Sequence, residues 1–336
     1  MRAVRVASPS SAALETAELP VPHPRDGQVR VRVEACGICH SDALTIMNYW
    51  PGITFPRVPG HEIAGAIDAI GNGVIGWKAG DRVGIGWHGG HCGHCDRCRR
   101  GDFLTCRSLQ IPGISYDGGY AQYVEVPAVA LARIPDALSA AEAAPLMCAG
   151  VTTFNALRHS QARAGDLVAI LGIGGLGHLG VQYAAHMGFE TVAIARGAGK
   201  AALARDLGAH HYIDSTAVNS GDALRQMGGA KVVLATATSA KAMEAVIPGL
   251  GIDGQLLIVG AANEPVAFDA TQAIGARQSV RSWASGTCAD SEDAMQFSVL
   301  TGVRARIETL PLSRAKDAYD KMLRGEARFR MVLLPE

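Results

Sequence analysis

The chain has few aromatic residues, no excess of charge of either sign and no long apolar run. Phe, Trp and Tyr make up 5% of its 336 residues, and 31 basic residues balance 31 acidic ones. Balanced charge argues against binding to nucleic acid or to an anionic membrane surface. No apolar run reaches the roughly 20 residues that cross a bilayer, and the opening segment, MRAVRVASPS, lacks the apolar core of a secretory signal. We therefore expect a cytoplasmic protein with neither a membrane nor a nucleic-acid partner.

Glycine and cysteine, by contrast, are plentiful. The 40 glycines fit an α/β protein with many tight turns between strands and helices. The eight cysteines are clustered instead of being spread through the chain, a distribution that favours metal binding in a reducing compartment over a disulfide framework. A chain of 336 residues has room for two domains, each with its own core.

Four cysteines lie in a polar loop of residues 88–107, with the spacing C-x2-C-x2-C-x7-C: Cys92, Cys95, Cys98 and Cys106. Zinc bound by four thiolates is tetrahedral and has no open position, so such a site stabilises structure and performs no chemistry. Metal binding also supplies folding free energy that so polar a loop cannot gain from apolar burial. Two disulfides, or four idle thiols, are the alternative; three cysteines within seven residues disfavour it.

The first 145 residues read as short strands and turns. In Gln28–Ala35 the valines at 29, 31 and 33 alternate with polar residues, as they do in a half-buried strand. Asp81–Ile85 and Tyr120–Val126 are further strand candidates. We expect a β-rich barrel or sandwich that carries the metal loop.

The pattern changes near residue 140, where helices and strands begin to alternate. Ser139 followed by Glu142 has the spacing of a capping box and predicts a helix start. Alternation of this kind predicts a parallel sheet with helices on both faces. The expected strands are 167–171, 191–195, 231–235, 255–259 and 329–333, and the expected helices are 176–187, 200–207 and 313–324.

The strand 167–171 runs directly into the glycine pattern Gly172-x-Gly174-x-x-Gly177, followed by a helix. In a dinucleotide site the first glycine makes a tight turn, the second lets the backbone approach a pyrophosphate, and the third allows close helix–strand packing. The helix N-terminus adds positive potential for the phosphates. A glycine-rich turn that binds nothing is the alternative, which the strand-turn-helix context disfavours.

The end of the second strand of this unit bears on the choice of cofactor. It reads Ala195-Arg196-Gly197, where an NAD-binding site normally has an Asp or Glu for the ribose. A guanidinium pairs with a 2′-phosphate, and Lys200 is a second cation nearby, so we favour NADP over NAD. Arg196 as a merely solvated loop residue is the alternative.

A second set of metal ligands lies outside the cysteine-rich loop. Cys39, His61 and Cys148 would bind zinc through two thiolates and an imidazole, leaving one position open for an alcohol or carbonyl oxygen. From the residues alone the choice stays open, because a buried cysteine is more often a small apolar residue. Cys36 and Cys288 fit that description, and the competing ligands are His40, His88, His91 and His94.

Five motifs in order resolve that choice: CGICHSD, GHEIAG, the four-cysteine loop, PLMCAGVTTF and LGIGGLGHLG. Together they resemble the zinc-dependent medium-chain alcohol dehydrogenases over essentially the whole chain. The resemblance implies a GroES-like catalytic domain of residues 1–149 and 287–336 that carries the zinc loop. A doubly wound Rossmann domain of residues 150–286 interrupts it.

The resemblance also implies roles for single residues and two zinc ions per subunit. Cys39, His61 and Cys148 would hold the catalytic zinc, with Glu62 as a transient fourth ligand and Asp42 orienting His61. Ser41 resembles the residue that takes the alcohol proton and passes it toward the cofactor ribose. The remaining cofactor-binding residues implied are His40, Thr152, Gly175, Leu176, Ala195, Val259 and Arg330.

Two positions bear on the substrate and on proton transfer. Trp87 resembles a pocket tryptophan of this family, and we expect Trp50, Tyr49 and Trp283 to join it, although packing at the domain interface is an equal alternative for Trp50 and Trp283. Such a pocket favours small primary alcohols and aldehydes, aliphatic or aromatic, over sugars; secondary alcohols stay open. Leu44 stands where many relatives have a relay histidine, so the proton is expected to leave from the ribose to water.

Three other classes compete with this interpretation. A zinc-free quinone or enoyl reductase of the same superfamily would lack the Cys39, His61 and Cys148 set. A zinc-ribbon nucleic-acid binder would use the basic cluster at Arg97, Arg99, Arg100 and Arg107, against the neutral chain as a whole. A non-enzymatic, crystallin-like protein would not need the ligands. We expect a homotetramer or homodimer in which strands of the Rossmann sheet pair across subunits.

Overall fold

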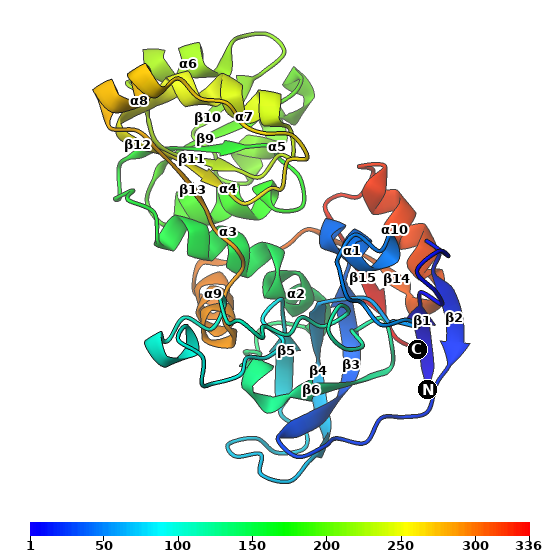
Figure 1. Cartoon of the computed structure of the whole chain (residues 1–336). Coiled ribbons are helices and arrows are strands. Elements are labelled where there is room, and N and C mark those ends of the chain that lie inside the picture. Colours follow the sequence, from blue (N-terminus) through cyan, green and yellow to red (C-terminus); the bar gives the residue numbers. More distant parts are fainter. The chain divides into compact units, whose positions relative to one another are not determined.

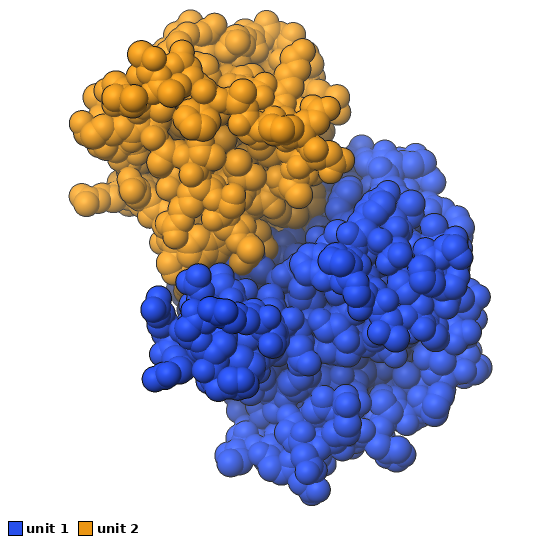
Figure 2. Space-filling model, in the orientation of Figure 1, with its two compact units in different colours: residues 1–151, 285–336 blue, residues 152–284 orange.

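The computed structural model describes residues 1–336 and divides into two compact units (Figures 1 and 2). The first unit comprises Met1–Val151 and Ser285–Glu336, and the second comprises Thr152–Ala284. The boundaries expected from the sequence lie at residues 149/150 and 286/287. None of the helices is long and apolar enough to span a membrane.

The first unit is built on a mixed sheet in the strand order β14-β15-β3-β4-β5-β7, with β6 added beside β3. All its pairings are antiparallel except that of β14 with β15. A separate hairpin pairs β1 with β2. The strands are β1 (Arg2–Arg5), β2 (Glu15–Glu18), β3 (Gln28–Gly37), β4 (Glu62–Ile70), β5 (Arg82–Ile85), β6 (Tyr123–Pro127), β7 (Ala132–Arg133), β14 (Ile307–Pro311) and β15 (Arg330–Leu334).

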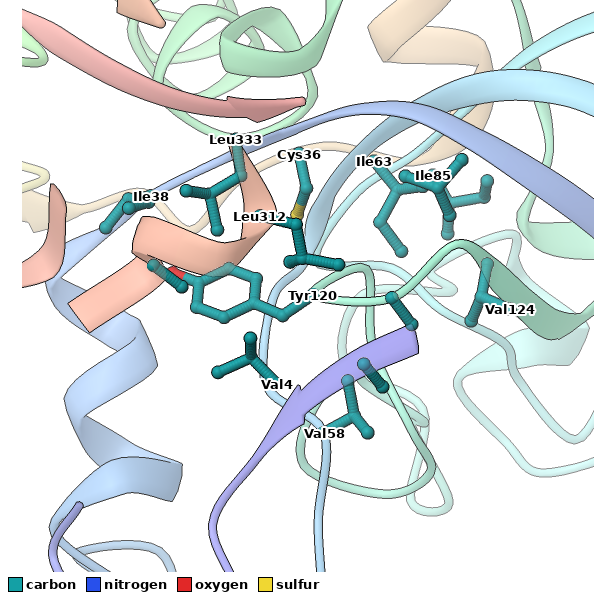
Figure 3. Close-up of a cluster of buried hydrophobic side chains, with 14 of the residues drawn as sticks. Val4, Cys36, Ile38, Val58, Ile63, Ile85, Tyr120, Val124, Leu312 and Leu333 are labelled. Atoms are coloured by element: carbon teal, nitrogen blue, oxygen red, sulfur yellow. The ribbon is translucent and has the colours of Figure 1, made fainter. Parts of the chain in front are cut away.

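The β3 strand organises the core of this unit. It pairs with β4, β6 and β15, and the predicted alternation is confirmed because Val29, Val31 and Val33 are buried. Figure 3 shows part of the resulting apolar cluster, to which β1, β4 and the C-terminal segment also contribute. The helices of this unit are α1 (Ala43–Ile46), α2 (Ala140–Ala143), α9 (Cys288–Thr301) and α10 (Ala315–Leu323), with the start of α3 (Ala149–Arg158).

The second unit holds an entirely parallel six-stranded sheet in the order β10-β9-β8-β11-β12-β13. This is the doubly wound order. The first strand, β8, lies near the centre; β9 and β10 are added on one side of it, and β11, β12 and β13 are then added on the other side. The strands are β8 (Leu167–Leu171), β9 (Glu190–Ala195), β10 (His211–Asp214), β11 (Ala230–Ala235), β12 (Leu250–Ile258) and β13 (Ser279–Ser282). Every residue of β8 is buried, as expected for a strand covered on both faces.

Helices cover both faces of the parallel sheet, and Figure 1 shows α3 and α4 on the opposite side from α6 and α8. Besides α3, the helices are α4 (Gly177–His186), α5 (Ala201–Asp206), α6 (Ser220–Gln226), α7 (Ala240–Val246) and α8 (Ala270–Ala276). The predicted fold class, a β-rich domain with a Rossmann domain, is confirmed.

Helix starts follow the predicted chemistry at residue level. The Ser139 hydroxyl accepts the N–H of Glu142, and the Glu142 carboxylate accepts the N–H of Ser139, which is the expected capping box. The α-helix that follows is only Ala140–Ala143, because Pro145 has no N–H to donate and the chain tightens there into a 3-10 turn, Ala144–Met147.

Candidate metal and cofactor sites

The residues predicted to bind the second metal come from three places in the first unit. Cys39 follows β3, and His61 precedes β4. These two strands are antiparallel, with Gly37 opposite Glu62, so the end of one lies beside the start of the other. Cys148 lies between the 3-10 turn Ala144–Met147 and α3. The fold therefore gathers ligands that are more than 100 positions apart.

The ligand atoms of Cys39, His61, Glu62 and Cys148 all lie within 4.8 Å of one another. The sulfurs of Cys39 and Cys148 are 3.9 Å apart, against an edge of about 3.8 Å in a tetrahedron whose Zn–S bonds are about 2.3 Å. The Nε2 atom of His61 is buried and has no hydrogen-bond partner. Because a buried polar atom without a partner is costly, this donor set fits a metal ion.

Asp42 holds the imidazole of His61 from the side away from the cluster. Its Oδ1 lies 3.0 Å from Nδ1 of His61, while its Oδ2 accepts the backbone N–H of Cys39 at 2.9 Å. A carboxylate on Nδ1 fixes that nitrogen as the proton carrier and leaves Nε2 free to bind a metal. Asp42 thus contacts two of the predicted ligands.

Glu62 pairs with Arg330, a residue that the family resemblance implies at the cofactor pyrophosphate. The Arg330 guanidinium donates to Glu62 Oε1 and to the carbonyl of Ile38, and all three residues are buried. Burial raises the pKa of Glu62 to about 7, although the Arg330 charge opposes the rise. The other carboxylate oxygen, Oε2, is buried without a partner, and a Cβ at Gly37 would lie 2.0 Å from it.

The pKa values of Cys39 and Cys148 are shifted in opposite directions. A hydrogen bond from the Cys148 thiol, helped by His61 and Arg330, lowers the pKa of Cys39 well below its usual value in spite of burial. The same contact and burial raise the pKa of Cys148 well above its usual value. A cluster that stabilises one thiolate even without a metal is suited to binding a cation.

Aromatic side chains flank the cluster. The Trp87 ring lies 5.2 Å from the His61 ring, edge to face, and Trp50 lies 6.3 Å from Trp87. Tyr49 is largely exposed. Trp283 belongs to the second unit, where its ring stacks on His159 at 4.6 Å.

Ser41 and His40 lie on the 3-10 turn His40–Asp42, directly after Cys39. Ser41 is half-buried, and the His40 side chain is exposed. The turn therefore places a hydroxyl next to a predicted metal ligand. Leu44, which stands where many relatives have a relay histidine, is half-buried and is the second residue of α1.

The four-cysteine loop forms a second compact cluster. The sulfur of Cys92 is 3.9 Å from Cys98 and 3.6 Å from Cys106, while Cys95 is 3.6 Å from Cys98 and 4.0 Å from Cys106. These distances fit a tetrahedral edge of about 3.8 Å and exclude disulfides, whose S–S length is about 2.05 Å. Backbone N–H groups of Cys98 and Arg107 lower the pKa of Cys95 to about 6, which favours the thiolate.

The glycine turn of the second unit has the geometry that its pattern predicts. Gly172 has a φ of +95°. A Cβ at Gly177 would stand 1.8 Å from the carbonyl oxygen of Gly172, so only glycine lets α4 approach the turn this closely. A Cβ at Gly174 would meet no atom within 4 Å, which leaves its backbone open to a phosphate. Thr236, after β11, donates to the carbonyls of Leu171 and Gly172 and pins the turn.

The end of β9 presents the predicted cation. Arg196 is exposed, and the loop after it is braced by Asp214, whose Oδ1 accepts the N–H of Gly197 at 2.8 Å. The Lys200 ammonium lies 3.4 Å from the carbonyl of Ile173, which brings it beside the glycine turn. The other predicted cofactor residues are placed as follows: Gly175 and Leu176 in the turn before α4, Ala195 at the end of β9, Val259 after β12, and Thr152 in α3.

Two residues of these sites were not anticipated from the sequence. Tyr120 donates a hydrogen bond to Asp42, and Thr236 braces the glycine turn. Both are distant in sequence from the residues they contact, and neither belongs to a motif with a known spacing. The Glu62–Arg330 pair is a third such feature, because nothing in the sequence links positions 62 and 330.

Comparison with known proteins finds dehydrogenases both among protein families and among single relatives. Residues 25–136 match the alcohol dehydrogenase GroES-like domain, and residues 175–299 match the zinc-binding dehydrogenase domain. Alcohol dehydrogenase patD of Penicillium expansum is 43% identical over 322 residues, covering 96% of this chain and 94% of that protein.

Solved structures agree with these matches over the whole fold. A thermostable alcohol dehydrogenase from Pyrobaculum aerophilum, with cobalt and zinc bound, superposes with a TM-score of 0.88 at 27% identity, covering 100% of this chain and 99% of that one. CAD from Helicobacter pylori, complexed with NADP(H), gives 0.85 at 25% identity, covering 99% and 97%. The two-domain fold and its cluster of candidate metal ligands are those of a zinc-type dehydrogenase, and the chain belongs to the medium-chain alcohol dehydrogenase family. It is therefore an oxidoreductase.

Proposed function

We propose that this alcohol dehydrogenase interconverts small primary alcohols, aliphatic or aromatic, with their aldehydes, and that it prefers NADP(H) to NAD(H). We further propose two zinc ions per chain, one in each ligand cluster, and we include secondary alcohols among the substrates to be tested. The observation that carries the proposal is the set Cys39, His61 and Cys148, of which the first two are buried and the third is half-buried, beside Trp87.

The chemistry follows from the donor set and its surroundings. Zinc bound there supplies a Lewis acid for the substrate oxygen. Asp42 keeps the His61 proton on Nδ1, so that Nε2 faces the cluster. Trp87 gives the site a largely apolar wall, which suits the hydrocarbon part of an alcohol better than a polyol that needs several polar partners.

Ser41 is the residue proposed to accept the alcohol proton. It is half-buried on the turn between Cys39 and Asp42, so it lies next to a proposed zinc ligand in the chain and is still partly open to solvent. Leu44 has no titratable group and cannot relay the proton from Ser41, so a bound cofactor would supply ribose hydroxyls for its transfer to water. Glu62, neutralised by Arg330, is proposed as the transient extra ligand.

The preference for NADP rests on the end of β9. Ala195 is followed by the exposed Arg196 instead of a carboxylate, and Lys200 lies beside the glycine turn. A guanidinium pairs with a 2′-phosphate, which a carboxylate would repel. We propose that Arg196 contacts that phosphate.

We also propose a homo-oligomer, as a tetramer or a dimer. The β13 strand is the last of its sheet, pairs only with β12, and is exposed along its length. Exposed apolar side chains lie on β13, on its neighbour β12 and in or just before α8, and an unpaired edge strand is a template for a second chain. These side chains are Ile252, Phe268, Ile274 and Val280.

Absorbance at 340 nm tests the proposal, with NADP and NAD in parallel and with benzyl alcohol, short alkanols and their aldehydes as substrates. We expect turnover with benzyl alcohol to be faster with NADP and to be abolished when a chelator strips the catalytic metal, then restored by zinc. Turnover that survives complete removal of the metal would favour the zinc-free reductase class. Faster turnover with NAD would leave the reaction intact and overturn the cofactor assignment.

A further inference from the structure

Tyr120 lies deep in the first unit and is bonded to the residue that orients His61. Its side chain is fully buried, and Figure 3 shows its ring between Val4 and Leu312. The hydroxyl donates to Oδ2 of Asp42 over 2.8 Å. The other oxygen of Asp42 lies 3.0 Å from Nδ1 of His61. The hydrogen-bonded series therefore ends at Nε2 of His61, a buried atom without a partner.

The same tyrosine also contacts the segment that leads into His61. The N–H of Tyr120 donates to the carbonyl of Pro59 at 3.0 Å, and the N–H of Gly119 donates to the carbonyl of Gly60 at 2.9 Å. Gly60 has a φ of +102°, and a Cβ there would stand 2.5 Å from Cδ1 of Tyr120. The ring thus occupies space that any other residue at position 60 would need.

We propose that Tyr120 is a positioning residue for the catalytic metal, acting through Asp42 on His61. This inference rests on the proposed metal site at Cys39, His61 and Cys148. The Asp42 carboxylate accepts three donors: the hydroxyl of Tyr120, the N–H of Cys39 and the imidazole of His61. Without the hydroxyl, the buried Oδ2 atom of Asp42 loses one of its donors, which is unfavourable. We expect the Asp42 carboxylate to rotate toward another donor, and this rotation would misalign the imidazole of His61.

The variant Tyr120→Phe keeps the ring in the core and removes only the hydroxyl. Zinc affinity is measured by competition with a chelator. Cadmium-113 NMR of the cadmium-loaded chain assigns the loss to a site, because each sulfur ligand shifts the metal resonance and the two clusters differ in sulfur number. We expect affinity at the site with two sulfurs to fall about tenfold, the lower end of the effect of an outer hydrogen-bond partner, and the four-sulfur site to be unchanged.

Tyr116→Phe is the matched control. The hydroxyl of Tyr116 donates to the backbone carbonyl of Gly89 at 2.8 Å and does not contact Asp42. Its loss removes a comparable hydrogen bond from the same unit, so affinity at the two-sulfur site should stay within about twofold of the unchanged chain. An equal fall in both phenylalanine variants would mean a general loosening of the unit and would overturn the proposal.

A second measurement separates positioning from mere stability. Activity of Tyr120→Phe is followed from limiting to saturating zinc, and we expect it to be low at limiting zinc and restored at saturation. Unchanged affinity, or activity that zinc does not restore, would overturn the role of Tyr120. If the wild-type protein gives only the resonance of the four-sulfur site, the catalytic metal site does not exist, and both proposals fail.

Discussion

At the scale of single residues, Arg196 is the most direct test of cofactor choice. Replacement by alanine removes the charge proposed to pair with the 2′-phosphate. A hydrogen bond to a charged group contributes about 1.5–3 kcal/mol, so the KM for NADP should rise roughly 10- to 100-fold while that for NAD changes little. Steady-state kinetics with both cofactors gives the ratio.

Arg205→Ala serves as the control for this prediction, because Arg205 is another exposed arginine of the same unit, on α5. It should leave both KM values unchanged. The converse variant, Ala195→Asp, should raise the use of NAD by placing a carboxylate where the ribose binds. If neither variant changes the ratio of the KM values for NADP and NAD, the end of β9 does not contact the 2′-phosphate.

Residues with a fixed spacing could be predicted, and residues whose role depends on tertiary packing could not. The four-cysteine loop and the glycine pattern have local spacings that their chemistry requires. Tyr120 looks like one aromatic residue in a predicted strand, and only the fold shows that its hydroxyl reaches Asp42, 78 positions away. The resemblance places Arg330 at the cofactor pyrophosphate, and only the fold shows that its guanidinium also donates to Glu62.

At the scale of elements, the loop 88–107 should depend on its metal. It contains no α-helix or β-strand, only the 3-10 turn Cys98–Arg100. Backbone pairing between Gly90 and Gln110 holds the start of the loop, and we expect the sulfur cluster to hold the part that follows. Cys98→Ser removes one ligand, and the loop should then become accessible to trypsin, because it carries the exposed residues Arg97, Arg99, Arg100 and Arg107. Mass spectrometry of limited digests locates the cuts.

Cys288→Ser gives the comparison for the loop variant. Cys288 lies outside both clusters, and its thiol donates to the carbonyl of Val129. Its digestion pattern should match that of the unchanged chain. If Cys98→Ser is equally resistant to trypsin, the loop is held by contacts other than a metal.

Most elements with a strong apolar pattern were found within one or two residues, but β12 begins five residues before the predicted 255–259 and β6 begins three residues after the predicted start at 120. Weakly patterned elements were missed. The predicted strand 167–171 agrees with β8 in full because a central parallel strand is apolar throughout. The β13 strand reads Ser-Val-Arg-Ser and is wholly exposed, so no burial pattern marks it. The β10 and β14 strands were missed as well, because each is short, lies at the end of its sheet and buries few of its side chains.

At the scale of the whole molecule, the exposed edge at β13 predicts association. Val280→Lys places a charge on that edge and should shift the protein from its oligomer toward the 35.1 kDa chain. Size-exclusion chromatography with light scattering measures the mass. Val218→Lys, at an exposed valine of the same unit, should leave the mass unchanged. If Val280→Lys keeps the oligomer mass, as Val218→Lys is expected to do, the interface lies elsewhere on the chain.

The interleaved order of the two units could be anticipated only through the family resemblance. Composition and periodicity show where β-rich texture gives way to alternating strands and helices. They do not show that residues 285–336 return to the first unit, because β15 joins β3 through backbone hydrogen bonds that leave no mark on the sequence. Long-range pairing of this kind is decided by the fold as a whole.

The ion pair of Arg330 with Glu62 joins positions that are 268 residues apart. During synthesis at about 5–20 residues per second, Glu62 therefore waits roughly 13–54 s for its counter-charge to be made. Until then a carboxylate destined for full burial has no guanidinium beside it, and closing the pocket around it is unfavourable. The parallel-sheet unit, continuous in the chain, is finished first. On the ribosome, the half of the enzyme that begins first is thus the half that is completed last.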